Sequence, residues 1–174
     1  RPCLRNVSPS VRCKHIPHTV DTNVFKRLPE EEVTRLRKEF GFGDKFVCFW
    51  NNRNARRKQS GTLIWWFKEF LDKVGHDEAV LLMHTEPDDH NGQDLVAIIE
   101  ELEITKGQVQ LSTVKIPPVD LAKLYNAADC TINISDAEGF GLATLESLAS
   151  ETPIIVNMTG GLQEQVTDGT SFFG

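Results

Sequence analysis

The sequence predicts an α/β domain in which a parallel β-sheet is covered by helices on both faces, as in a Rossmann-like fold. Short apolar segments, each suited to one strand, alternate along the chain with longer segments whose apolar residues recur at helical spacing. The alternation begins near Phe46, after an irregular opening, and continues to Asn157. Strand, helix, strand order favours a parallel sheet with right-handed crossovers, because such crossovers place helices on both faces.

The first strands are predicted at residues 46–50 and 79–84, which are almost continuous apolar runs. Parallel strands buried on both faces show such runs. Between them, residues 62–74 have the amphipathic spacing of a helix. We expect the aromatic residues of this helix to pack in the core: Trp65, Trp66, Phe67 and Phe70.

The rest of the chain continues the pattern with helices at residues 93–102 and 119–127, a short strand at 109–111, and longer strands at 128–135 and 153–157. A further helix ends at Ser150, between the last two strands. In it, Leu142, Leu145 and Ala149 share one face and form an apolar arc, which Glu146 flanks.

Length and composition fit one ordinary globular domain. The chain has 174 residues, of which 40% are hydrophobic and 25% charged. The net charge of −6 gives no general attraction to nucleic acid, so that partner is not expected. No apolar run approaches the length of a membrane span. We expect an irregular opening segment at residues 1–25 and a Rossmann-like domain at residues 26–174.

The cysteines favour a reducing compartment. Cys48 and Cys130 fall inside predicted buried strands, and Cys3 and Cys13 show neither disulfide-framework nor zinc-site spacing. We therefore expect a cytoplasmic protein, with the cytoplasmic face of a membrane as an alternative location, and no metal site.

Two carboxylates, Glu138 and Glu146, lie eight residues apart around a glycine-containing turn that leads from a strand into a helix. Glu138 follows the carboxyl end of a predicted strand, which is where open parallel sheets bind ligands. Gly139 and Gly141 allow close backbone approach, and the following helix start suits a phosphate oxygen. Ionised carboxylates accept well from sugar hydroxyls. Taken singly, each glutamate also fits an ordinary surface role.

Basic residues follow the first predicted strand. Arg53 and Lys58 suit a diphosphate, because Arg can bind two phosphate oxygens and Lys supplies a point charge. Arg56 and Arg57 stand between them, and spacing alone does not separate the four.

The order of these motifs resembles that of the group 1, family 4 type retaining glycosyltransferases. The segment from Ile134 to Val156 resembles their E-x7-E signature, and Phe49 to Lys58 resembles their strand followed by G-R-x4-K. Ile16 to Phe25 is similar to the start of their C-terminal domain, and Gly160 to Glu164 to their G-G-x-P-E turn. The match covers roughly residues 16 to 170.

The resemblance implies the C-terminal half of a two-domain GT-B glycosyltransferase, with the acceptor site in an N-terminal domain that this chain lacks. It implies a nucleoside diphosphate sugar of the UDP or GDP type as donor, an unknown acceptor, retention of configuration, and no cofactor or obligatory metal. Arg53, Lys58 and Glu138 would be the catalytic residues, and Glu146 would hold the ribose. The remaining donor-binding residues would be Ile116, Gly139, Phe140, Gly141 and Leu142.

Two departures and three alternatives accompany this prediction. Asn52 and Gln163 replace the Gly before the motif's Arg and the Pro of the G-G-x-P-E turn. The first alternative is another GT-B enzyme, a sugar-nucleotide epimerase or a phosphorylase. The second is a catalytically silent binding or scaffolding domain. The third is a flavodoxin-like or dehydrogenase domain, although no G-x-G-x-x-G follows the first strand.

Overall fold

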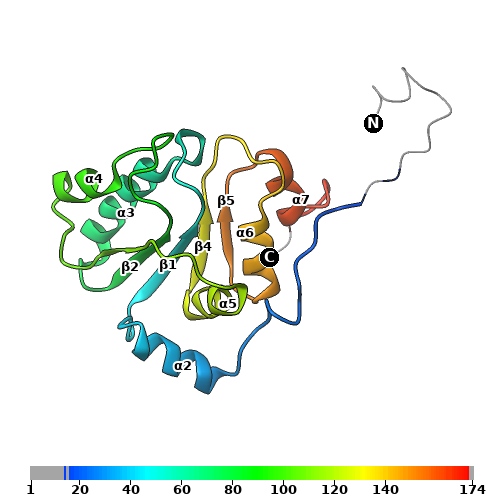
Figure 1. Ribbon diagram of the computed structural model, residues 1–174, viewed down its shortest axis with the longest axis horizontal. Coiled ribbons are helices and arrows are strands. Elements are labelled where there is room, and N and C mark those ends of the chain that lie inside the picture. The colour runs from blue at the N-terminus through cyan, green and yellow to red at the C-terminus, as the bar shows by residue number, and fades with distance from the viewer. Residues whose placement is uncertain (1–13, 15, 173–174) are drawn as a thin grey trace.

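Five parallel strands form the sheet of the computed structural model, which describes residue 14 and residues 16–172 (Figure 1). The order across the sheet is β3-β2-β1-β4-β5. The strands are β1 (Phe46–Asn51), β2 (Ala79–His84), β3 (Val109–Ser112), β4 (Cys130–Asn133) and β5 (Ile154–Val156). All neighbouring pairs are parallel, which confirms the predicted Rossmann-like α/β class.

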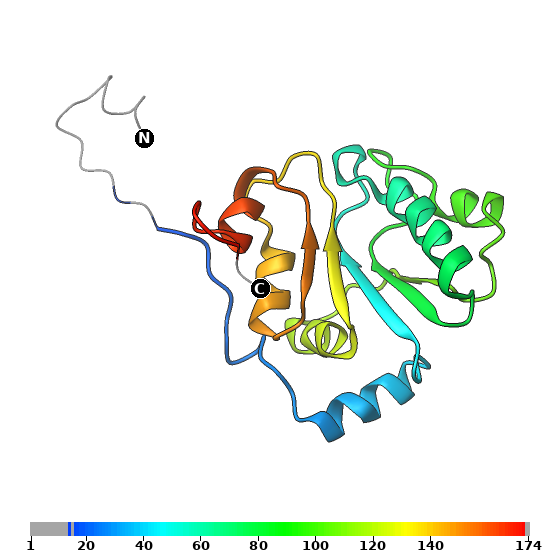
Figure 2. The same ribbon diagram turned by 180° about the vertical axis from the view of Figure 1, so that it is seen from behind.

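Helices cover both faces of this sheet (Figure 2). They are α2 (Glu30–Glu39), α3 (Ser60–Val74), α4 (Leu95–Glu101), α5 (Pro118–Ala127), α6 (Leu142–Ala149) and α7 (Gln163–Val166), with the 3-10 turns η1 (Arg56–Lys58) and η2 (Gly160–Leu162). A hydrophobic core lies on each face of the sheet, and alternate residues of β1 contribute to the two cores. Cys48 and Trp50 pack towards α3 and α4, whereas Val47 and Phe49 pack towards α2 and α5.

The sheet has one topological switch point, between β1 and β4. From β1 the chain moves outward to β2 and β3, and then returns to the other side of β1 to form β4 and β5. The loops after β1 and β4 therefore meet at the carboxyl edge of the sheet, which is the upper edge in Figure 1. Open α/β sheets bind ligands at such a point.

Helix α2 was not predicted, because it precedes Phe46, where the predicted alternation of strands and helices begins. Three glutamates occupy its first turn and Arg37 and Lys38 its last turn, in keeping with the helix dipole. Val33 and Leu36 are buried, and the helix packs on α5. Before α2, residues 16–25 contain no helix or strand. Residues 1–13 and 15 of the predicted opening segment, with Cys3 and Cys13, lie outside the described residues.

The prediction that all four aromatic residues of α3 pack in the core is wrong for Trp65, Trp66 and Phe70. Phe67 is 4% exposed, but Trp65 and Trp66 are 48% and 49% exposed, and Phe70 is 37% exposed. Successive helical residues point about 100° apart, so residues 65, 66 and 67 cannot share one face. Phe67 lies on the face that meets the sheet.

The buried face of α6 is also different from the predicted apolar arc. Thr144 and Ser147 are fully buried, whereas Leu142 is 45% exposed. The Ser147 hydroxyl lies 2.8 Å from Thr131 Oγ1 on β4 and 3.0 Å from the carbonyl oxygen of Thr152. Small hydroxyl side chains with partners can lie against the sheet, so α6 packs closely on β4 through its polar residues.

Asn126 of α5 joins the segment before α2 to the domain. Its side chain is buried, donates to the carbonyls of Lys26 and Ala122 at 2.9 Å, and accepts from the N–H of Leu28 at 2.8 Å. We predict that Asn126→Ala lowers the free energy of unfolding by about 1–3 kcal/mol, because backbone groups lose their partners.

Urea unfolding measures this cost, with Lys123→Ala on the same helix as control. Lys123 pairs with Asp120 at 2.7 Å in a half-exposed ion pair, so its loss should cost only about 0–1 kcal/mol. Equal costs for the two variants would show that Asn126 does not hold the segment.

Candidate functional site

A buried ion pair bridges the switch point of the sheet. The Lys58 ammonium in η1 donates to Glu138 Oε2, in the loop after β4, and to Asn52 Oδ1 at 2.7 Å. The side chains of Lys58 and Glu138 are only 7% and 12% exposed. Burial lowers the pKa of Lys58, although its bond with Glu138 opposes that shift. Two of the three predicted catalytic residues are thus in direct contact.

Backbone contacts beside this pair fix both loops. Arg57 Nη1 donates to the Ala137 carbonyl at 2.5 Å, and the Asp136 N–H donates to the Arg57 carbonyl at 2.8 Å. The second carboxylate oxygen of Glu138 accepts from the N–H of Gly139 at 3.1 Å. Both oxygens of Glu138 are therefore already engaged, and the carboxylate has a fixed orientation.

The backbone of the Gly160-Gly161 turn lies in close contact with the loop that carries Glu138. Gly160 has φ of +51°, and a Cβ there would lie 1.7 Å from the Glu138 carbonyl oxygen. A Cβ on Gly161 would lie 2.5 Å from Phe140 Cα, and its N–H donates to the same Glu138 carbonyl at 3.2 Å. Only glycine fits this close approach, so the turn helps to shape the site.

The predicted donor-binding loop, Gly139 to Leu142, leads into α6 and is held from behind by a residue that the sequence analysis missed. Gln165 of α7 is buried and donates to the carbonyls of Phe140 and Gly141 at 2.7 and 3.0 Å. Its side-chain oxygen meets Thr144 Oγ1 at 2.7 Å. With these carbonyls directed to Gln165, the loop is fixed at the amino end of α6.

Glu146, the second glutamate of the pair, lies on α6 and accepts from the Tyr125 hydroxyl at 2.7 Å. Burial raises the pKa of Glu146, and the bond from Tyr125 partly offsets this. Burial also raises the pKa of Tyr125 well above its ordinary value. No apolar periodicity marks this contact, which joins residues 21 positions apart.

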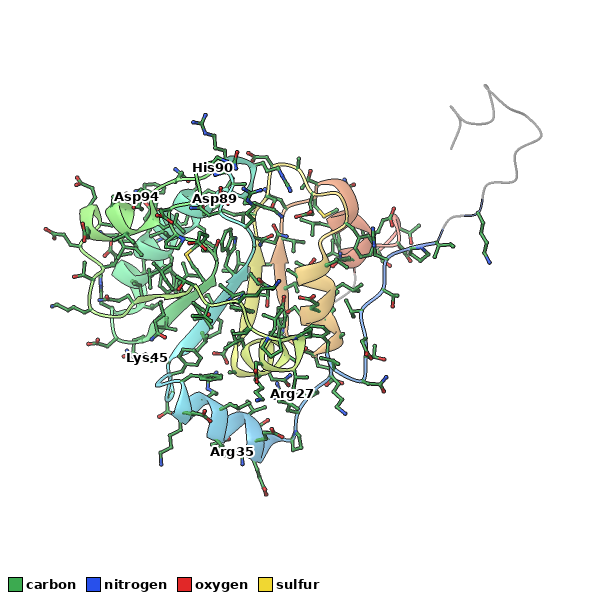
Figure 3. All side chains as sticks on the ribbon, in the orientation of Figure 1. Arg27, Arg35, Lys45, Asp89, His90 and Asp94 are labelled. Carbon is green, nitrogen blue, oxygen red and sulfur yellow. The ribbon has the colours of Figure 1, made fainter. Side chains whose placement is uncertain are left out.

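Arg53 is not in contact with the Lys58–Glu138 pair. Its guanidinium is 61% exposed and donates from Nε and Nη2 to the two carboxylate oxygens of Asp89, at 2.5 and 3.1 Å. Asp89 lies at the carboxyl edge of the sheet (Figure 3), is only 10% exposed, and Arg53 holds its pKa well below the usual range. Asp89 is therefore a largely shielded carboxylate held in a bidentate ion pair.

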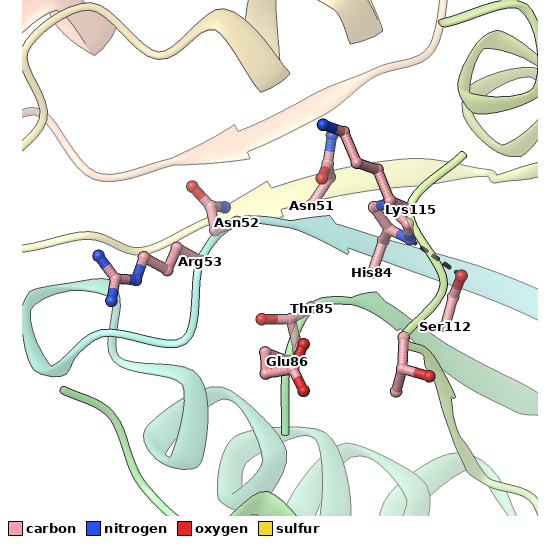
Figure 4. A pocket seen from close by; sticks show the side chains of 9 residues that line it. Asn51, Asn52, Arg53, His84, Thr85, Glu86, Ser112 and Lys115 are labelled. Atoms are coloured by element: carbon pink, nitrogen blue, oxygen red, sulfur yellow. Dashed lines mark hydrogen bonds between the residues drawn. The ribbon is translucent and has the colours of Figure 1, made fainter. Parts of the chain in front are cut away.

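An open cavity of about 250 Å³ extends from Arg53 across the carboxyl ends of β1, β2 and β3 (Figure 4). Asn51 and Lys115 line it, together with His84, whose ring lies 2.9 Å from the Ser112 hydroxyl. Burial lowers the pKa of His84. Ile116, the predicted base contact, lines a second cavity, between α2 and α5.

Comparison with known proteins now gives the family. The family model described as glycosyl transferases group 1 matches residues 33–173. The chain belongs to this family. It is 30% identical to the D-inositol 3-phosphate glycosyltransferase of Corynebacterium jeikeium over 161 residues, which cover 90% of this chain and 38% of that enzyme. It is 28% identical to the alpha-monoglucosyldiacylglycerol synthase of Streptococcus pneumoniae, covering 100% of this chain and 40% of that enzyme.

Solved structures of glycosyltransferases share the fold. Sucrose-phosphate synthase from Thermosynechococcus elongatus superposes with a TM-score of 0.75 at 24% identity, covering 94% of this chain and 39% of that one. Anabaena HepE in complex with UDP and glucose gives 0.72 at 20% identity, covering 86% and 39%. The C-terminal domain of LpcC from Francisella tularensis gives 0.72 at 20% identity, covering 89% and 78%. The predicted GT-B class is confirmed.

The chain thus spans about two fifths of the curated relatives that it matches along most of its length. Among the described residues, no helix is both long enough and apolar enough to cross a bilayer. The same residues contain no group of three or more His, Cys, Asp or Glu side chains arranged to hold a metal ion.

The buried ion pair generates a stability prediction. Lys58→Met should lower the free energy of unfolding by about 3–5 kcal/mol, because it leaves the Glu138 carboxylate buried without its cation. The double variant Lys58→Met with Glu138→Gln should cost less than the sum of the single changes, since neither charge then remains unpaired. Urea unfolding of the four proteins measures the coupling.

The matched control is Lys68→Met, which removes a lysine whose exposed pair with Asp72 has the same chemistry at 2.6 Å. Its expected cost is about 0–1 kcal/mol. Additive costs at Lys58 and Glu138, or a Lys58 cost no larger than that of Lys68, would contradict the prediction.

Glu146 generates a prediction on pH. Its folded-state pKa lies above the ordinary value of 4.5, so the folded domain binds this proton more tightly than the unfolded chain. Stability from this group is therefore present below pH 4.5 and is lost as the pH rises through the folded-state pKa. Glu146→Gln removes that loss and should raise the melting temperature at pH 8, on the order of 2 °C, but not at pH 4.5.

Thermal unfolding at the two pH values tests this, with Glu69→Gln on the exposed side of α3 as control. The control should shift the melting temperature little at either pH. A Glu146→Gln variant that is less stable than the parent at pH 8 would show that the carboxylate is fully compensated in the fold.

Proposed function

We propose that this chain is the donor-binding domain of a retaining glycosyltransferase, which transfers a sugar from a nucleoside diphosphate sugar of the UDP or GDP type. The observation that carries the proposal is the buried Lys58–Glu138 pair at the switch point, beside the glycine-shaped loop into α6. At that place the cation suits the diphosphate of a nucleotide sugar, and the carboxylate suits the hydroxyl groups of its sugar ring.

Glycosyl transfer breaks the bond between the anomeric carbon and a phosphate oxygen. Positive charge develops on the sugar ring while negative charge develops on the departing diphosphate, so fixed charges of opposite sign near each lower the barrier. Lys58 would stabilise the diphosphate. Glu138, whose carboxylate is already oriented by Lys58 and Gly139, would accept from donor hydroxyls and hold the ring in place.

The remaining groups extend this arrangement along the donor. The backbone N–H groups from Gly139 to Leu142 would contact the sugar and the diphosphate, and Glu146 would accept from the ribose. The cavity lined by Asn51, His84 and Lys115 would take the base. Ile116 would contribute through its main chain.

Arg53 would change partner when the donor binds. In the structure its two donor nitrogens are satisfied by Asp89, and a diphosphate oxygen pair offers the same bidentate geometry. Arg53 is exposed and lines the cavity, so a change of rotamer suffices for the exchange. The acceptor would bind to an N-terminal domain of the whole enzyme. Retention of the anomeric configuration would likewise be a property of the whole enzyme.

Arg53→Ala tests the diphosphate assignment. Calorimetry with UDP, GDP and ADP first selects the nucleotide that binds the domain best. We predict that Arg53→Ala then weakens this nucleotide about 10- to 100-fold, because a charge-assisted contact contributes about 1.5–3 kcal/mol.

Arg56→Ala is the matched control, since it removes the same charge from the same loop at an exposed position. It should weaken binding by less than about threefold through long-range charge alone. Equal effects of the two changes would mean that the loop acts only as a basic patch. Absence of binding by all three nucleotides would overturn the proposed function itself.

A further inference from the structure

A tyrosine hydroxyl lies where the core of the domain meets the candidate site. Tyr125 of α5 is fully buried, and its ring packs edge-on against Phe49 and Phe25, with centroids 5.0 and 6.1 Å apart. A phenylalanine would fill this space equally well. The hydroxyl is therefore not needed for apolar packing, and burying it requires hydrogen-bond partners.

The partners of that hydroxyl set the direction of a short chain of hydrogen bonds. Asn51, the last residue of β1, donates from Nδ2 to the Tyr125 oxygen at 2.9 Å, and the Tyr125 hydroxyl donates to Glu146 Oε2 at 2.7 Å. An amide nitrogen can only donate and a carboxylate oxygen only accepts. The single proton of Tyr125 is therefore committed to Glu146, because Asn51 occupies the acceptor side of the hydroxyl.

This chain leaves one oxygen of the carboxylate available. Within the part of the chain that the structure describes, Glu146 Oε2 has the bond from Tyr125, whereas Oε1 makes no hydrogen bond to another residue. The orientation of the carboxylate is then set by the position of the Glu146 Cα on α6 and by the hydrogen bond from Tyr125. Asn51 also lines the cavity beside Arg53 (Figure 4), so the chain connects that cavity with Glu146.

We propose that Tyr125, oriented by Asn51, is a positioning residue that holds Glu146 so that its second oxygen accepts from a ribose hydroxyl of the donor nucleotide. The inference rests on the proposed function, in which Glu146 meets the ribose. It assigns the selectivity for ribose over deoxyribose to a residue that does not itself touch the ligand. Without the tyrosine hydroxyl the carboxylate can turn away, and the contact with the ribose is lost.

The experiment compares ribose recognition in the parent domain and in Tyr125→Phe. Calorimetry is performed with the best-binding nucleoside diphosphate and with its 2′-deoxy and 3′-deoxy analogues. The parent should bind at least one deoxy analogue about tenfold or more weakly, as expected for a lost hydrogen bond to a charged acceptor. Tyr125→Phe should bind the ribonucleotide about tenfold more weakly than the parent does, yet discriminate against that analogue by less than about threefold.

A control and a second variant separate positioning from packing. Phe25→Leu alters the ring packed on Tyr125 but keeps the hydroxyl, so it should lower the melting temperature and leave the discrimination unchanged. Asn51→Leu frees the acceptor side of the hydroxyl and should reduce the discrimination only partly. Circular dichroism confirms that each variant is folded before it is titrated.

Two results would overturn the inference in different ways. If the parent discriminates and Tyr125→Phe discriminates equally, Tyr125 merely packs in the core and the proposed function stands. If the parent binds ribose and deoxyribose nucleotides equally, Glu146 does not meet the ribose, and that part of the proposed function falls together with the inference.

Discussion

The contact between Lys58 and Glu138 is the interaction on which the site depends. A buried ammonium needs a buried anion, and these two residues come from loops on opposite sides of the switch point. Their pairing brings the loop after β1 against the loop after β4, where Arg57 and Asp136 add backbone contacts. The Gly160-Gly161 turn closes the same loop from the other side, and no side chain would fit there.

Two ion pairs lie at the site, and they differ in exposure. Lys58 and Glu138 are buried and fixed, whereas Arg53 is exposed and pairs with Asp89. A diphosphate bound here as proposed would contact the buried ammonium and would replace Asp89 as the partner of the exposed guanidinium. Asp89 holds Arg53 beside the cavity, at a position where the guanidinium remains exposed to water.

The sequence predicts the sheet well because β1 and β2 are short apolar runs and strands alternate with helices along the chain. It predicts Lys58 and Glu138 through the family motifs. It fails where polar side chains are buried. Thr144 and Ser147 occupy the core face of α6 because each finds a hydroxyl, amide or carbonyl partner far away in the sequence. The bond of Tyr125 to Glu146 is of the same kind. The periodicity of apolar residues predicts which face is buried, but it does not predict which donor and acceptor meet after folding.

Asn52 is a departure from the family pattern whose role can be explained only from its hydrogen-bond partner in the folded structure. In sequence terms, an asparagine where the family has glycine removes a position of close backbone approach. In the structure its side-chain oxygen accepts from the Lys58 ammonium at 2.7 Å, so the buried cation has a neutral acceptor as well as Glu138. When Glu138 also accepts from a donor hydroxyl, as proposed, Asn52 keeps one N–H of the ammonium bonded. The substitution therefore supports the cation from within the loop instead of opening the loop to the phosphate.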